Sequence, residues 1–380
     1  MLASFGAAPV HAQNASLSLD SSPQKIVLPS ALPSGNPIND RLLFTFYSAR
    51  RVAGESGPVP AVVLLHLLGT TNNSQMRGFA RYLAARGVAS AVVTLPYHMK
   101  RLPRGDSPLR HFVGSNAATV VQAFNQSAAD VSSVVTWLGA RSEVDKSKIS
   151  VLGISLGAIV THLVMGSDAR INGGVAIVGA GDLPDIYRRS VLGRFVVKPR
   201  ITLTPADELR LREVDPLTYA NQNQPRRVLM IEAARDLVIP PRDAKELWNA
   251  LGRPPIRWVD VNHFGLELFP RASQRAALTY LRSVWNGAPL IKAPSIKVPA
   301  LKAGLISGLD ARVSPAVTLQ LFSFGTRRDH LALLHGDVGV SGRGPFAGIA
   351  ATINQFADFG VGRRLGGDRF RPYVSLHLTY

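Results

Sequence analysis

The sequence predicts an α/β fold, a mostly parallel sheet with helices on both faces, followed by an antiparallel β module. Three observations lead to this prediction. Short apolar runs alternate with helical segments between residues 41 and 286, as expected of a parallel sheet that is covered on both faces. One strand-to-helix junction carries the pentapeptide Gly153-Ile154-Ser155-Leu156-Gly157. Beyond Trp285 the helical spacing stops, and glycine-rich runs with a period of two follow, which indicates half-buried strands.

The elements of the α/β domain follow from their periodicity. Residues 41–49 alternate and are typical of an edge strand, whereas continuous apolar runs indicate buried parallel strands. The segment between Gly181 and Gln224 is too long for a simple connection. We therefore expect a small cap at about residues 182–222, over the carboxyl edge of the sheet. The further strands are expected at 58–66, 88–96, 148–154, 171–179, 226–233 and 255–261, and the helices at 74–87, 115–140, 156–166, 241–252 and 273–285.

Composition limits the class of protein. The length of 380 residues allows a large domain and a smaller one, and a hydrophobic fraction of 46% allows a sizeable core. The absence of cysteine excludes disulfides, thiolate metal sites and a cysteine nucleophile. The net charge is +18, but the basic residues are scattered and form no stripe with aromatic residues. We therefore predict no nucleic-acid partner, and we interpret the charge as favouring solubility and adhesion to anionic surfaces.

The amino-terminal segment resembles the end of a secretory signal. In residues 1–13, small and apolar residues lead to Val10-His11-Ala12, which fits the small-x-small cleavage rule, although no basic residue precedes them. We interpret this segment as the remnant of a signal peptide and predict an exported protein, periplasmic or secreted. A disordered tail is the alternative. Residues 14–40 are rich in Ser, Pro and Asn and are expected to form a loose lead-in.

The candidate nucleophile is Ser155. Glycines on either side of a serine leave room for the sharp strand-to-helix turn of a nucleophile elbow. At the start of the following helix, unpaired N–H groups and the helix dipole favour an anion. A glycine-rich turn with a capping serine is the structural alternative.

A serine hydroxyl needs an adjacent base, and the base needs an acid to orient it. His263 directly follows the predicted strand 255–261, and Asp236 follows the strand 226–233. Both positions lie at the carboxyl edge of the sheet, where the sites of such folds form. Asp182 is the second choice for the acid, and His98 is a candidate for the substrate pocket. His66 and His162 are weaker candidates for the base, and Asp260 is interpreted as a charge at a strand end.

The order Ser155, Asp236, His263 is that of α/β-hydrolases, and residues 41–286 resemble that superfamily. The resemblance is to esterases and peptidases of the dienelactone-hydrolase and prolyl-oligopeptidase kind, through the phrases LLHLLGTT, LPYH, KISVLGISLGA, VDPLTYA and LMIEAARDLVIPP. In that family an oxyanion loop, usually His-Gly, follows the strand that here ends at His66. Leu67 replaces the glycine, and the resemblance implies the backbone N–H groups of Leu67 and Leu156 as oxyanion donors.

These residues predict a serine hydrolase that cleaves small or medium carboxylic esters through an acyl-enzyme, without metal or organic cofactor. An exported serine peptidase of related fold is an alternative, as is a binding or structural protein that kept the hydrolase scaffold. Apolar cap residues at helical spacing are expected to cover Ser155, with Tyr187 and Phe195 as pocket candidates. An insertion that merely packs on the core would explain the same pattern.

A Pro- and Lys-rich linker at residues 287–296 leads to a C-terminal module, residues 297–380. We expect an antiparallel meander of about four or five strands. Its final run, 374–380, alternates and ends on an aromatic residue, and it resembles the end of outer-membrane β-barrel proteins. Because membrane barrels have at least about eight strands, we favour a soluble sheet that packs on the hydrolase or on a second copy of the chain. Peripheral or outer-membrane association is the alternative that stays open.

Overall fold

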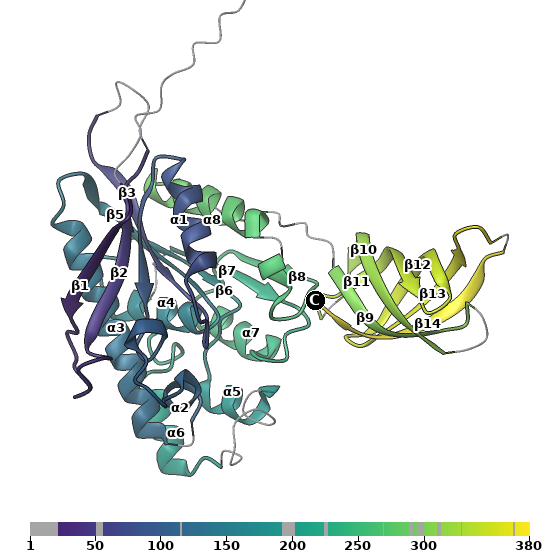
Figure 1. The fold of residues 1–380 in the computed structure, drawn as a ribbon, viewed down its shortest axis with the longest axis horizontal. Coiled ribbons are helices and arrows are strands. Elements are labelled where there is room, and N and C mark those ends of the chain that lie inside the picture. The colour runs from purple at the N-terminus through teal and green to yellow at the C-terminus, as the bar shows by residue number, and fades with distance from the viewer. Residues whose placement is uncertain are drawn as a thin grey trace, which may run out of the picture.

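The protein comprises an α/β domain, from β1 to α8, and a C-terminal barrel, from β9 to β14 (Figure 1). The fold class predicted from the sequence is thereby confirmed. The structure is a computed structural model, and the predicted signal remnant at residues 1–13 lies outside the residues that it describes. The described residues are 22–50, 56–114, 116–191, 202–223, 227–268, 270–288, 292–294, 296, 300–309, 313–327, 329–367 and 369–380.

The sheet of the α/β domain has eight strands in the order β1-β2-β4-β3-β5-β6-β7-β8. The pairs β1–β2 and β2–β4 are antiparallel, and all other neighbours are parallel. β4 and β6 are buried along their whole length, as their continuous apolar sequences predict. The strands are β1 (Gln24–Pro29), β2 (Arg41–Tyr47), β3 (Val59–Leu65), β4 (Ala89–Thr94), β5 (Val144–Ile154), β6 (Gly173–Ile177), β7 (Arg227–Ala233) and β8 (Ile256–Val259).

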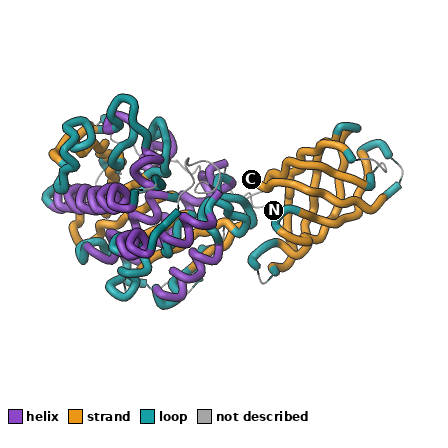
Figure 2. Tube along the Cα trace, turned by 90° about the horizontal axis from the view of Figure 1, so that it is seen from below, coloured by secondary structure: helices purple, strands orange, loops and turns teal. Residues whose placement is uncertain are grey.

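Helices cover both faces of this sheet (Figure 2). α1 (Ser74–Ala84) and α8 (Pro270–Trp285) pack on one face, and α3 (Ala117–Gly139), α4 (Leu156–Ser167) and α7 (Pro241–Ala250) pack on the other. Alternate residues of β3 pack into the hydrophobic cores on the two faces of the sheet. Val63 lies in one core and Val62 in the other. Among the described helices, none is both long and apolar enough to cross a bilayer.

The lead-in predicted at residues 14–40 contains a strand that the sequence analysis missed. β1 pairs with β2 from Gln24–Phe46 to Pro29–Arg41, so β2 is the second strand of the sheet and not its edge. The sequence Gln-Lys-Ile-Val-Leu-Pro is short and mostly exposed. Its Pro- and Ser-rich surroundings hide the alternation, because such residues usually mark loops.

The described part of the predicted cap contains α5 (Leu183–Arg189) and α6 (Pro205–Arg212). Asp215, which follows α6, accepts hydrogen bonds from the N–H groups of Asp182 and Leu183 at 2.9 and 2.6 Å. This carboxylate therefore joins the two ends of the segment. Phe195, predicted as a pocket residue, lies outside the described residues.

The C-terminal module is a closed antiparallel barrel with the strand order β10-β11-β12-β13-β14-β9. It has six strands where the sequence suggested about four or five. Glycines such as Gly348, Gly360 and Gly362 interrupt the apolar–polar alternation that predicts strands. They are required here because a Cβ at any of them would lie 2.7–3.1 Å from the ring of Tyr373. The strands are β9 (Ala300–Ser307), β10 (Ser314–Thr326), β11 (Ala332–Ser341), β12 (Gly344–Asn354), β13 (Ala357–Arg364) and β14 (Arg371–Thr379).

The barrel contacts the loops that follow β7 and β8. Arg235 donates to the carbonyl oxygen of Gln355 at 2.8 Å and forms an ion pair with Asp260 at 2.6 Å. Asp260 in turn accepts the N–H of Ala332 at 2.9 Å. One ion pair thus links the two loops to each other and to the barrel.

Candidate active site

Ser155 lies on a strained turn between β5 and α4. Its φ of 54° and ψ of −114° are sparsely populated for a residue with a side chain, at a cost of about 1–3 kcal/mol. The N–H of Ser155 donates to the carbonyl oxygen of Ile177 at 2.9 Å, which fixes the turn to the end of β6. The hydroxyl is thereby placed at the carboxyl edge of the sheet, at the start of a helix.

The flanking glycines make this turn sterically feasible. A Cβ at Gly153 would lie 1.9 Å from the carbonyl oxygen of Gly157, and a Cβ at Gly157 would lie 2.4 Å from that of Leu65. Neither clash can be relieved by moving a side chain, because both contacts are with backbone. The pentapeptide is therefore a geometric requirement of the elbow and not only a sequence motif.

Ser155, His263 and Asp236 lie in one chain of hydrogen bonds. His263 Nε2 is 2.8 Å from Ser155 Oγ, and His263 Nδ1 is 2.6 Å from Asp236 Oδ2. All three side chains are buried. With the Nδ1 proton donated to Asp236, Nε2 is left as the acceptor for the serine hydroxyl, which is the arrangement that a general base requires.

The carboxylate of Asp236 is held by the backbone. Its second oxygen accepts the N–H groups of Val238 and Ile239, each at 2.8 Å, and this fixes the oxygen that faces His263. Burial, and then the charge of Asp236, raise the pKa of the neighbouring Glu232 well above its ordinary value.

The two backbone groups predicted as oxyanion donors belong to the loop after β3 and to the start of α4. Leu156 is the first residue of α4, and Leu67 follows the end of β3. Neither N–H has a hydrogen-bond partner within the described part of the chain. Both amides can therefore receive a new acceptor without breaking an existing bond.

A pair of buried histidines supports the loop that carries Leu67. His98 Nε2 accepts the N–H of Gly69 at 3.0 Å, and His66 Nε2 accepts the N–H of Leu95 at 3.0 Å. The two rings meet edge to face, with centroids 4.7 Å apart. Burial lowers the pKa of His66 to about 3 and that of His98 to about 4, so both rings are neutral and can act as acceptors.

This position of His98 differs from the predicted one. The ring is wholly buried and is not among the residues that line the cavity beside Ser155. This supporting role was not predicted from the sequence, because the bond to Gly69 joins two loops that are 29 residues apart. The phrases LLHLLGTT and LPYH each place a histidine after a strand. This repetition is the feature of the sequence that indicates a paired role for His66 and His98.

An apolar cavity adjoins Ser155, with a volume of about 60 Å³. Tyr187, predicted as a pocket residue, lines it, and its hydroxyl donates to the carbonyl oxygen of Phe112 at 2.6 Å. No described residue that lines the cavity is charged. The lining consists of Leu68, Phe112, Val113, Phe124, Ser155, Leu156, Ile159, Leu183, Ile186, Tyr187, Ser190, Val238 and Ile239.

The weaker candidates have other contacts. Asp182 caps α5 by accepting the N–H of Asp185, and Asp260 pairs with Arg235. His162 is buried within α4, where burial lowers its pKa to about 4. None of these three side chains takes part in the hydrogen-bond chain of Ser155.

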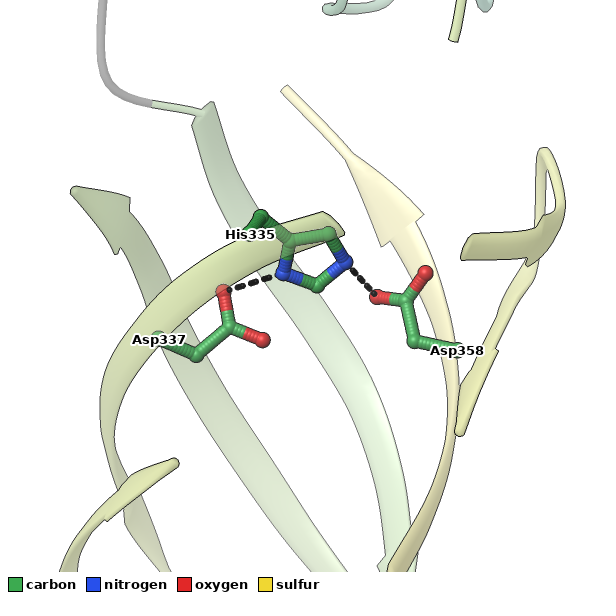
Figure 3. A group of neighbouring side chains, drawn as sticks. All are labelled: His335, Asp337 and Asp358. Carbon is green, nitrogen blue, oxygen red and sulfur yellow. Dashed lines mark hydrogen bonds and ion pairs between the residues drawn. The ribbon is translucent and has the colours of Figure 1, made fainter. Parts of the chain in front are cut away.

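One cluster outside this site has the residue types of a metal centre. In the barrel, His335 lies between Asp337 and Asp358, at 3.0 and 3.3 Å (Figure 3). The ammonium group of Lys302 lies 2.7 Å from Asp358 and 3.6 Å from Asp337. A metal ion would have to displace this cation, so the residues present form a charge-compensated network and do not fit a metal.

Comparisons with known proteins agree with this geometry. The family model of the prolyl oligopeptidase family matches residues 122–271, a range that contains Ser155, Asp236 and His263. Two uncharacterized proteins of Mycobacterium tuberculosis, from strains CDC 1551 and H37Rv, are each 27% identical over 183 residues, which are 47% of this chain and 43% of each relative. The chain thus spans less than half the length of these relatives.

Solved structures share the architecture of the α/β domain. A puromycin-hydrolyzing peptidase of M. tuberculosis is similar with a TM-score of 0.54 and 17% identity, over 72% of this chain and 41% of that one. A 2,6-dihydroxy-pseudo-oxynicotine hydrolase is similar with a TM-score of 0.52 and 17% identity, over 72% of this chain and 71% of that one. The acylaminoacyl peptidase of Pyrococcus horikoshii is similar with a TM-score of 0.51 and 16% identity, over 69% of this chain and 41% of that one. The domain therefore has the α/β-hydrolase fold.

If His98 positions the oxyanion loop, its loss should reduce turnover more than binding. We expect His98→Leu to lower kcat by about tenfold, with little change in KM, because the N–H of Gly69 loses its acceptor. His98→Gln, whose amide oxygen can accept the same N–H, should restore much of kcat. Steady-state kinetics on a nitrophenyl ester measure both. Equal losses in the two variants would contradict this role.

The lowered pKa values of His66 and His98 predict how the stability of the protein depends on pH. Their pKa values in the folded protein lie near 3 and 4, below the ordinary value of 6.5. Between these folded and ordinary values, the unfolded chain therefore binds more protons than the folded protein does. The stability that they contribute is complete above pH 6.5 and is lost as the pH falls towards 4. Thermal unfolding across this range should show a falling Tm, and His98→Gln should reduce the slope. A Tm independent of pH in this window would refute the assignment of neutral histidines.

Proposed function

We propose that this protein is a serine hydrolase that cleaves carboxylic esters with a short, uncharged acyl group. The observation that carries the proposal is the hydrogen-bond chain from Asp236 through His263 to Ser155, which ends beside an apolar cavity. The match to the prolyl oligopeptidase family and the α/β-hydrolase fold support hydrolase chemistry.

The geometry supports acyl transfer in two steps. Ser155 Oγ attacks the carbonyl carbon of the ester while His263 Nε2 takes its proton. The imidazolium that forms is stabilised by Asp236, and it then protonates the leaving alcohol. Water enters, gives its proton to His263 and attacks the acyl-enzyme, which releases the acid and restores Ser155.

Two backbone groups are proposed to stabilise the negative oxygen of the tetrahedral intermediates. The N–H groups of Leu67 and Leu156 are without partners in the described structure, and Leu156 adds the positive end of the α4 dipole. Each such donor typically contributes about 10²–10³ in rate. His66 and His98 hold the Leu67 loop and so keep one donor in place before substrate arrives.

The cavity supports an ester with a small apolar acyl group. Its volume of about 60 Å³ leaves little room for a long chain, and its described lining offers no charged partner for an α-amino group or an ionised side chain. The second candidate function is peptide hydrolysis. The family match favours it, and two of the similar structures are named peptidases.

Variants of the hydrogen-bond chain test the proposal. We expect Ser155→Ala to lower kcat on a nitrophenyl ester by about 10⁴–10⁶, and adding His263→Ala should cost little more, because the residues act as a unit. Ser142→Ala, which changes an exposed serine that does not line the cavity, is the control and should stay within a few-fold of the unchanged protein. Multiplying losses, or full activity in Asp236→Asn, would count against the mechanism.

A second prediction concerns the cavity. Ile186 lies on α5 and lines the cavity, so Ile186→Ala should enlarge it and raise kcat/KM for longer acyl chains relative to acetate. Leu209→Ala, on the exposed side of α6, is the matched control. The ratios are measured with nitrophenyl esters of increasing length and with aminoacyl anilides. A preference that does not change in Ile186→Ala would show that the acyl group binds elsewhere, and faster cleavage of the anilides would favour the peptidase.

A further inference from the structure

The outer surface of the barrel is unusually apolar. Val27, Leu32, Ile38, Leu209 and Phe264 are the exposed large hydrophobic side chains of the described α/β domain, and all the others in the described structure belong to the barrel or its loops. Soluble proteins rarely expose contiguous apolar surface on this scale. The barrel residues include Leu305, Val317, Leu321, Phe322, Phe324, Leu333, Val338, Val340, Ile349, Phe359, Val361, Val374, Leu376 and Leu378.

Alternation along the strands directs the apolar side chains outward. In β14, Val374, Leu376 and Leu378 are exposed, whereas Ser375, His377 and Thr379 are buried. All six strands contribute exposed apolar residues, so the apolar surface surrounds the barrel. This is the reverse of the pattern of a soluble barrel, and it is the pattern of a barrel that faces lipid.

Three charged side chains of the strands lie inside the barrel, and the other three lie at strand ends. Lys302, Asp337 and Asp358 are buried inside the barrel and pair with one another. Asp358 Oδ2 lies 2.7 Å from His377 Nε2 and 2.7 Å from the ammonium group of Lys302. The other charged strand residues are Arg363, Arg364 and Arg371.

These arginines lie at one end of the barrel. Arg363 and Arg364 end β13, Arg371 begins β14, and the turn between β11 and β12 adds Arg343 at the same end. The opposite end contacts the α/β domain through Gln355 and Ala332. An apolar belt thus separates a basic rim from the domain, and a basic rim suits anionic lipid headgroups.

A lipid bilayer fits this surface better than a second copy of the chain does. A two-fold interface covers one patch on each partner, which would leave the rest of the belt in water. The strands have 8 to 13 residues, and a tilted strand needs about 9–11 to cross a bilayer. Aromatic side chains lie at both ends of the barrel, Phe324 and Tyr380 near the domain and Phe370 at the basic rim, as in membrane barrels.

We propose that the barrel inserts into the hydrocarbon layer of a lipid bilayer and anchors the α/β domain at its surface. Six strands are fewer than the roughly eight of small membrane barrels. The barrel nevertheless closes, and inside it the buried Tyr373 ring packs over Gly348, Gly360 and Gly362. The proposal does not depend on which bond the α/β domain cleaves.

Single cysteines offer a direct test, because the chain has none of its own. In the full-length protein, Val361→Cys, exposed on β13, is labelled with the dye NBD. It is mixed with vesicles of phosphatidylethanolamine and phosphatidylglycerol. We expect its emission to shift to the blue and to be quenched by lipids with brominated acyl chains. The control Leu209→Cys, exposed on α6, should do neither.

A paired measurement distinguishes insertion from adsorption. Ile349 and Val361 are opposite each other on β12 and β13, and the double change to Arg should lower the vesicle-bound fraction by about 30-fold or more. Leu209→Arg should not. Binding that high salt removes would mean adsorption through the basic rim and would overturn insertion. A protein that does not bind the vesicles, whether it is a monomer or a self-associated oligomer, would also overturn insertion. Unquenched Val361→Cys in vesicle-bound protein would overturn it as well.

Discussion

The strained turn at Ser155 is the constraint on which the catalytic geometry depends. The residue adopts its unusual backbone only because Gly153 and Gly157 have no side chains and because its N–H is bonded to the end of β6. The strain of about 1–3 kcal/mol is balanced by a buried parallel sheet that continues on both sides. The same turn places the hydroxyl 2.8 Å from His263 Nε2 and at the start of α4, which is the position that the proposed mechanism requires.

The sequence was sufficient to predict the contacts that belong to strand ends. The carboxyl ends of parallel strands meet at one edge, so Ser155, Asp236 and His263 could be named from their positions after predicted strands, and the structure brings them together. The role of His98 could not be predicted, because its bond to Gly69 depends on how two loops pack. β1 was missed because six mostly exposed residues carry little hydrophobic signal. One or two of the six barrel strands were missed because inward glycines interrupt the alternation.

The two domains meet where the active site is assembled. Arg235 precedes Asp236, and Asp260 lies three residues before His263. Their ion pair also holds the barrel through Gln355 and Ala332. A barrel whose surface favours lipid would therefore place this edge of the α/β domain close to the bilayer.

The barrel buries a charged network of Lys302, His335, Asp337 and Asp358. The alternation of side chains along its strands thus places these charges inside the barrel and apolar side chains on its outer surface.

The central claim is that Ser155 is the nucleophile of a preassembled site, and covalent trapping tests it most directly. The folded full-length protein is treated with a fluorophosphonate, digested and examined by mass spectrometry. A single adduct on the peptide that contains Ser155 is expected, and it should be lost when the protein is unfolded before treatment, because the hydroxyl is activated only by the assembled His263 and Asp236. An adduct on another residue, or none on the folded protein, would contradict the claim.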